Sequence, residues 1–116
     1  PHLFDGRLPD LNIGTDNGRT AAPSIQQAAV DVAAAAAPTF THVVNGRFRG
    51  GWTTRHYGQP QTGVHAIQME LAQATHLAAE SPPFAYDAAR AAPLRETLSA
   101  LLNRINALAA ELKGDA

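Results

Sequence analysis

Cysteine is absent from the sequence, which excludes disulfide bridges and metal sites built on thiolates. An excess of one charge is also lacking: the formal net charge is −1, so no broad basic field is present to attract nucleic acid or an anionic membrane. No apolar run approaches the roughly 20 residues of a membrane-spanning helix. The opening PHLFDGRLPD lacks the basic and then apolar segments of a secretory signal. These absences predict a cytoplasmic protein with neither a nucleic-acid nor a membrane partner.

Methionine is scarce as well, because Met69 is the only one and the chain opens on Pro1. We therefore expect either an internal piece of a longer protein or a start that was produced by processing. The 116 residues are enough for one hydrophobic core. The prediction for residues 1–116 is a single domain or the C-terminal portion of one larger hydrolase domain.

The apolar pattern predicts three helices. An alanine-rich helix is expected over residues 23–37, because Pro23 suits a first helical turn and alanine has the highest helix propensity. A leucine-striped helix is expected over residues 87–113, with an interruption at Pro93 and its stripe packed on the core. A shorter helix is expected over residues 73–80.

Strands are expected where β-branched and aromatic residues gather. They are predicted over residues 8–13 and 39–48, with a short extended piece over residues 52–57. Residues 64–71 alternate like a strand but contain good helix formers, so the pattern leaves both structures open. The order of strands and helices predicts an α/β fold.

The most unusual stretch is NGRFRGGWTTRHYG, residues 45–58, which places Arg47, Arg49 and Arg55 among four glycines in a nearly neutral chain. An arginine guanidinium forms paired hydrogen bonds with a carboxylate or phosphate. Glycine allows a loop to fold closely around a small ligand. The composition leaves two alternatives open, an anion-binding loop and a solvated basic loop.

A second candidate is Glu70, which lies between Met69 and Leu71 in QMEL. On a strand, this carboxylate would be partly withdrawn from water and suited to accept and donate a proton. Composition alone favours the alternative of an exposed glutamate on a helix. The five histidines do not show the H-E-x-x-H spacing of a helical zinc site, so a complete metal site within this chain is not predicted.

Three runs of the sequence resemble the C-terminal part of bacterial N-formylglutamate deformylases, also called N-formylglutamate amidohydrolases. These runs are LFDGRLPDLNIGTDNG, HVVNGRFRGGWTTRHYGQPQTGVHAIQMELAQ and FAYDAARAAPLRETL, within roughly residues 3–98. The resemblance implies a zinc-dependent hydrolase of histidine catabolism that converts N-formyl-L-glutamate to formate and L-glutamate. It also implies part of a three-layer α/β/α sandwich around a mixed sheet, similar to zinc carboxypeptidases and aspartoacylases.

The resemblance implies roles for individual residues. Glu70 matches the position of the family's general base, which favours a strand for residues 64–71. The small dicarboxylate substrate would be bound by Asn45, Arg47, Arg49, Thr54 and Arg55. An H-S-G-like metal motif does not occur in the sequence, so the zinc ligands are expected outside this chain, in an N-terminal half that would be its partner. The alternative is a non-catalytic anion-binding or interaction module.

Overall fold

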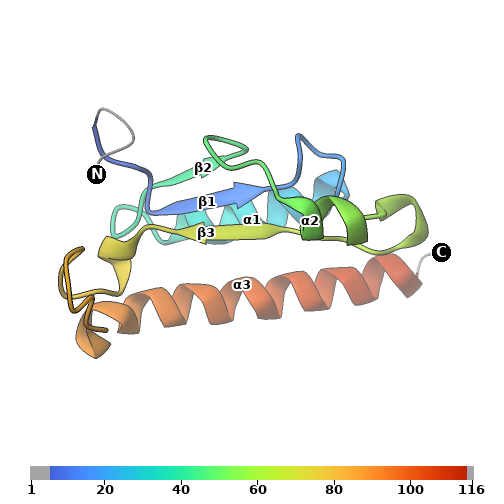
Figure 1. Cartoon of the computed structure of the whole chain (residues 1–116). Coiled ribbons are helices and arrows are strands. Elements are labelled where there is room, and N and C mark those ends of the chain that lie inside the picture. The colour runs from blue at the N-terminus through green and yellow to red at the C-terminus, as the bar shows by residue number, and fades with distance from the viewer. Residues whose placement is uncertain (1–5, 115–116) are drawn as a thin grey trace.

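A small mixed β-sheet forms the centre of the computed structural model, which describes residues 6–114 (Figure 1). Its strands are β1 (Leu11–Gly14), β2 (His42–Val44) and β3 (Gln68–Leu71), in the order β2-β1-β3. The central strand β1 runs parallel to β2 and antiparallel to β3. The sheet and its helices confirm the predicted α/β fold.

Two long helices, α1 (Pro23–Ala35) and α3 (Ala88–Gly114), cover one face of this sheet (Figure 1). Leu11 and Ile13 point from β1 into a core that contains Ala29 of α1 and Leu94 and Leu101 of α3. The small alanine side chains let α1 lie close to the sheet, and burial of the leucines stabilises the contact by about 1.5–3 kcal/mol for each fully buried side chain. The described residues thus form two layers, and the third layer of the predicted sandwich stays a prediction.

The leucine stripe of α3 packs on the core, as the sequence predicts, with Leu98 and Ile105 beside the buried leucines. Leu102 is an exception, because 70% of its surface is exposed. The expected interruption at Pro93 is wrong, since α3 runs through it without a break. The carbonyl that loses its hydrogen-bond donor belongs to Ala89, an exposed residue in the first turn of the helix.

The segment after β2 differs from the sequence prediction. The strand expected over residues 39–48 spans only His42–Val44, because Asn45 takes a left-handed backbone conformation with φ 48° and turns the chain away. The piece expected to be extended over residues 52–57 is the helix α2 (Trp52–Tyr57). Its form brings the rings of Trp52 and His56 into a stack at 4.3 Å, one helical turn apart.

The region around β3 is also less regular than predicted. The strand covers only the second half of residues 64–71, because the first half pairs elsewhere, with the Ala66 N–H donating to the Thr20 carbonyl at 2.8 Å. Residues 73–80 do not form the expected helix, since only the 3₁₀ turn η2 (Gln73–Thr75) is regular there. Among the described residues, no helix combines the length and apolar character needed to cross a bilayer.

Candidate functional site

The strand register places two polar side chains next to each other on the face of the sheet that the helices leave uncovered. Asn12 of β1 pairs with Glu70 of β3. Their neighbours in sequence, including Ile13 and Met69, point into the helix-covered core. Because side chains alternate along a strand, Asn12 and Glu70 both project on the opposite face.

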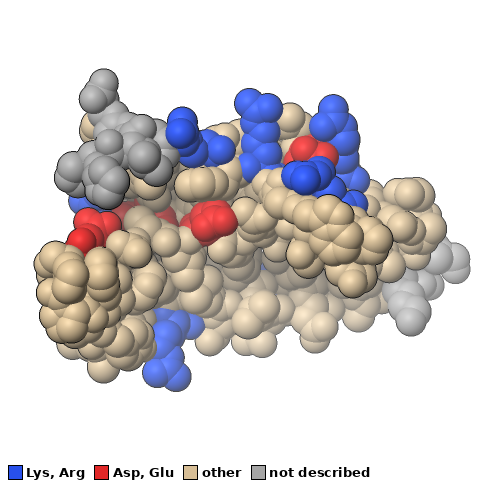
Figure 2. Space-filling view, in the orientation of Figure 1, with Lys and Arg blue, Asp and Glu red and all other residues tan. Residues whose placement is uncertain are grey.

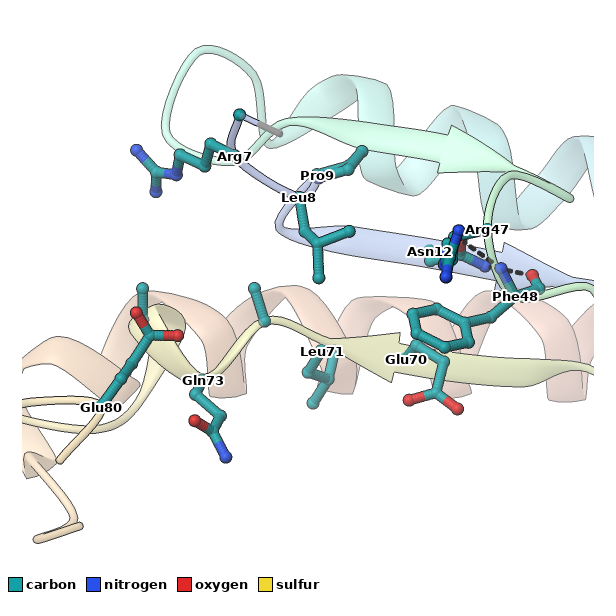
Figure 3. Close-up of a pocket in the computed structure, with 13 residues that line it drawn as sticks. Arg7, Leu8, Pro9, Asn12, Arg47, Phe48, Glu70, Leu71, Gln73 and Glu80 are labelled. Carbon is teal, nitrogen blue, oxygen red and sulfur yellow. Dashed lines mark hydrogen bonds between the residues drawn. The ribbon is translucent and has the colours of Figure 1, made fainter. Parts of the chain in front are cut away.

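This face forms one wall of a cavity of about 690 Å³ (Figure 3). The lining comes from residues 6–9 before β1, from residues 47–48 after β2, and from residues 70–74, with Asn12 and Glu80. In Figure 3, the Arg47, Phe48 and Glu70 side chains lie toward one end of the cavity and Glu80 lies toward the other. A guanidinium, an aromatic ring and a carboxylate therefore share one concave space, although their residues are far apart in sequence.

Asn12 holds the loop that carries Arg47 against the sheet. Its side-chain N–H donates to the Phe48 carbonyl at 2.6 Å, and the Phe48 N–H donates to its oxygen at 3.3 Å. The Asn12 side chain is buried, with 5% of the residue exposed. Sequence reasoning missed this residue. The available signal was a lone amide between two apolar strand residues in LNI, since a buried polar side chain requires hydrogen-bond partners.

Asn45 supports the loop from a second position. Its side-chain oxygen accepts the Thr15 N–H at 2.8 Å, and its side-chain N–H donates to the Thr15 hydroxyl at 3.0 Å. The Asn45 backbone N–H also donates to the Ile13 carbonyl at 2.7 Å. These bonds tie the end of β2 to the turn after β1. The predicted contact of Asn45 with substrate stays a prediction.

The second half of the loop approaches β1 so closely that Gly14 has no room for a side chain. A Cβ atom at this position would lie 2.9 Å from the Arg49 carbonyl carbon and 3.1 Å from the Gly50 nitrogen. The Arg49 carbonyl also accepts the Asp16 N–H at 2.6 Å. The absence of a side chain at Gly14 therefore allows the backbone of Arg49 and Gly50 to pack against the end of β1.

The predicted arginines occupy different positions. Arg47 lines the cavity with Glu70, whereas Arg49 and Arg55 do not belong to the described lining. Arg55 is exposed on α2 and donates to the Gly50 carbonyl at 2.7 Å. Figure 2 shows most of the basic side chains in view projecting along the upper edge of the molecule, with acidic side chains below them and, at one point, among them. Of these three arginines, Arg47 lines the same cavity as the Glu70 carboxylate, and Arg49 and Arg55 lie outside the described lining.

Thr54 is connected to Glu70 through Gln68. The Thr54 hydroxyl lies 3.3 Å from the Gln68 side-chain oxygen, which also accepts the Gly51 N–H at 2.6 Å. The Gln68 side-chain N–H donates to the Glu70 carboxylate at 2.7 Å. Thr54 is buried, with 7% of the residue exposed. Its hydroxyl helps to hold the Gln68 amide that contacts the Glu70 carboxylate. The predicted contact of Thr54 with substrate stays a prediction.

The described residues do not fit the zinc ion that the resemblance implies. Within residues 6–114, no three histidine or acidic side chains gather closely enough to hold a metal ion. The His65 Nδ1 accepts the Ala22 N–H at 3.0 Å, the His56 ring stacks on Trp52, and the His76 Nδ1 lies 2.9 Å from the Thr75 hydroxyl. Each of these three imidazoles contacts a different neighbour, and within residues 6–114 they do not share a ligand cluster.

Comparison with known proteins agrees with the resemblance seen in the sequence. A sequence model of the family described as N-formylglutamate amidohydrolase matches residues 1–77. The chain belongs to this family. The N-formylglutamate deformylase of Pseudomonas aeruginosa is 53% identical over 106 residues, and the deformylase of Pseudomonas putida is 47% identical over 111 residues. These alignments cover 88% and 96% of this chain.

The three matched proteins are longer than this chain. It spans 39% and 41% of the lengths of the two Pseudomonas deformylases. A crystal structure of N-formylglutamate amidohydrolase from Ralstonia eutropha JMP134 shares the fold, with a TM-score of 0.73 at 16% sequence identity. That match covers 98% of this chain and 38% of the Ralstonia protein. The chain thus corresponds to a part of these amidohydrolases.

We expect the amide of Asn12 to be essential for holding the loop. Asn12→Asp replaces its N–H donor by an oxygen, which would face the Phe48 carbonyl across the present 2.6 Å contact. Loss of this buried bond, with two oxygens left opposite each other, should lower the free energy of unfolding by about 1–3 kcal/mol. Urea unfolding measures this change. Asn103→Asp on the exposed surface of α3 is the matched control. Equal stability of the two variants would contradict the role given to Asn12.

Proposed function

We propose that the complete protein containing this chain hydrolyses N-formyl-L-glutamate to formate and L-glutamate. The observation that carries the proposal is the cavity that Arg47 and Glu70 share on one face of the sheet. The names of the two Pseudomonas relatives support the choice of substrate. As the resemblance implies, the reaction would belong to histidine catabolism, and the composition favours a cytoplasmic location.

Glu70 acts in this proposal as a general base and then a general acid. Its carboxylate takes a proton from the water that attacks the formyl carbon, and a tetrahedral intermediate forms. The same proton passes to the amide nitrogen as the C–N bond breaks, which releases formate and the amine of glutamate. The metal dependence is part of the proposal, and zinc ligands would have to come from outside the residues described here.

Arg47 binds a carboxylate of the substrate. Its planar guanidinium forms two parallel hydrogen bonds with a carboxylate, and Phe48 beside it offers an apolar surface for the methylene groups. The second carboxylate of the substrate requires another cation, for which Arg49 and Arg55 are the proposed candidates. Asn45 and Thr54 would support this binding loop or add hydrogen bonds to the ligand.

The proposal is tested by measuring formate release by the complete protein. We expect kcat/KM for N-formyl-L-glutamate to exceed that for N-formyl-L-glutamine by about 10- to 100-fold. The reason is that an amide of nearly the same shape loses a charged hydrogen-bonded pair that contributes about 1.5–3 kcal/mol. Incubation with a chelator should abolish turnover, and added zinc should restore it. Absence of formate release with zinc present would refute the proposed activity.

A further inference from the structure

The Gln68 side chain forms a short hydrogen bond with the Glu70 carboxylate. The two residues are two positions apart on β3, so their side chains project on the same face of the sheet. The Gln68 side-chain N–H donates to the Glu70 carboxylate oxygen Oε1 at 2.7 Å. The contact lies beside the cavity, because Glu70 lines it.

The orientation of the Gln68 amide follows from its other partners. Its oxygen Oε1 faces the Gly51 backbone N–H at 2.6 Å, and a backbone N–H can only donate. The Thr54 hydroxyl at 3.3 Å provides a second donor to the same oxygen. With the oxygen directed to these donors, the amide nitrogen must point toward Glu70. The Gln68 amide therefore donates a hydrogen bond to the carboxylate, and its orientation is fixed by the Gly51 N–H and the Thr54 hydroxyl.

We propose that Gln68 is a positioning residue that holds the Glu70 carboxylate in its reactive orientation. This inference rests on the proposed function, in which Glu70 transfers the proton. A glutamate side chain has three rotatable bonds, and a hydrogen bond to an anchored amide restricts them. Because the amide is neutral, it orients the carboxylate without adding a charge beside it. Gln68 itself does not touch the reacting atoms in this scheme.

The anchor of Gln68 belongs to the same continuous segment as the proposed substrate-binding arginine. Gly51 precedes α2 and Thr54 lies within it, only a few residues after Arg47. The segment is held to β1 by Asn12 at one point and to β3 by Gln68 at another. The orientation of Glu70 is thereby linked to the position of the loop that would bind the substrate carboxylate.

The test compares Gln68→Met with wild type in the complete protein. Methionine has nearly the same length and shape as glutamine but lacks the amide donor and acceptor. We expect kcat for formate release to fall by about 10- to 100-fold, because a small misplacement of a catalytic group has effects of this size. KM should change by less than about threefold, since Asn12 still holds the part of the loop that carries Arg47. Gln61→Met, on the exposed turn η1 (Pro60–Thr62), is the matched control.

Two further measurements distinguish positioning from general structural support. In a Glu70→Gln background, Gln68→Met should cause almost no additional loss of kcat, because residues that act as a unit are non-additive. Thr54→Val should lower kcat by a smaller factor of about three, and Thr54→Ser should recover most of that loss because it keeps the hydroxyl. If Gln68→Met fails to fold, Thr54→Val and Thr54→Ser, each alone and combined with Glu70→Gln, test whether the anchoring of Gln68 positions Glu70.

The outcomes separate this inference from the proposed function. If Glu70→Gln loses turnover while Gln68→Met keeps kcat within about twofold of wild type, the positioning role is wrong and the general base stands. A loss from Gln68→Met that adds in full to that of Glu70→Gln also overturns the positioning role. If Glu70→Gln retains near-normal turnover, the proposed base is wrong irrespective of Gln68.

Discussion

Replacing Glu70 by glutamine in the complete protein should lower kcat for formate release by about 10²- to 10⁴-fold, the range that general acid–base catalysis contributes. Glutamine has almost the same shape, so the Gln68 contact and the walls of the cavity should remain. It cannot take a proton from water at neutral pH, and proton transfer to the leaving amine is lost with it. KM should change by less than about threefold, because in the proposed mechanism Glu70 acts on the attacking water and does not bind the carboxylates of the substrate.

The control for this substitution is Glu96→Gln, which removes a carboxylate from the exposed surface of α3, away from the cavity. Its kinetic constants should equal those of wild type. Thermal unfolding of both variants checks that the fold is retained. Near-normal kcat in Glu70→Gln would remove Glu70 from the mechanism and leave the cavity without a proton acceptor on β3.

The second large effect is expected for Arg47→Ala, which should raise KM for N-formyl-L-glutamate by about 10- to 100-fold. Hydrogen bonds to charged groups contribute about 1.5–3 kcal/mol, and each 1.4 kcal/mol is a factor of ten. If Arg47 binds the carboxylate that the glutamine analogue lacks, KM for N-formyl-L-glutamine should change much less. Steady-state measurement of formate release with both substrates gives the comparison.

Arg55→Ala provides an internal comparison for Arg47. The sequence alone ranks the loop arginines equally, but the Arg55 guanidinium donates to the Gly50 carbonyl and lies outside the described cavity lining. We therefore expect a smaller rise in KM for Arg55→Ala than for Arg47→Ala. Arg95→Ala on the exposed surface of α3 controls for the loss of a positive charge. A larger effect at Arg55 would contradict the placement of Arg47 as the principal carboxylate ligand.

The secondary structure was predictable where local chemistry and tertiary packing agree. Pro23 starts α1 at the predicted residue, and the leucine stripe of α3 lies on the core. Prediction failed at residues 52–57, because Gly50, with φ 128°, lets the chain turn just before α2, and the stacked rings of Trp52 and His56 suit a helix. It failed again at residues 73–80, where only η2 is regular. Both segments are short, so their secondary structure depends on tertiary contacts more than on intrinsic propensity.

The sequence by itself predicted the α/β class, indicated the N-formylglutamate amidohydrolase family through its resemblance, and marked the QMEL and NGRFRGG segments as candidates. The class follows from residue type and spacing, whereas the family follows from the likeness of three runs of the sequence to known members. Only the tertiary structure decided that Arg47 rather than Arg49 or Arg55 shares a cavity with Glu70. It also revealed Asn12, bonded 36 positions away to Phe48, and Gln68, bonded 17 positions away to Gly51. The physical reason is that such contacts follow from strand register and loop path, which bring distant residues together and leave no periodic trace in the chain.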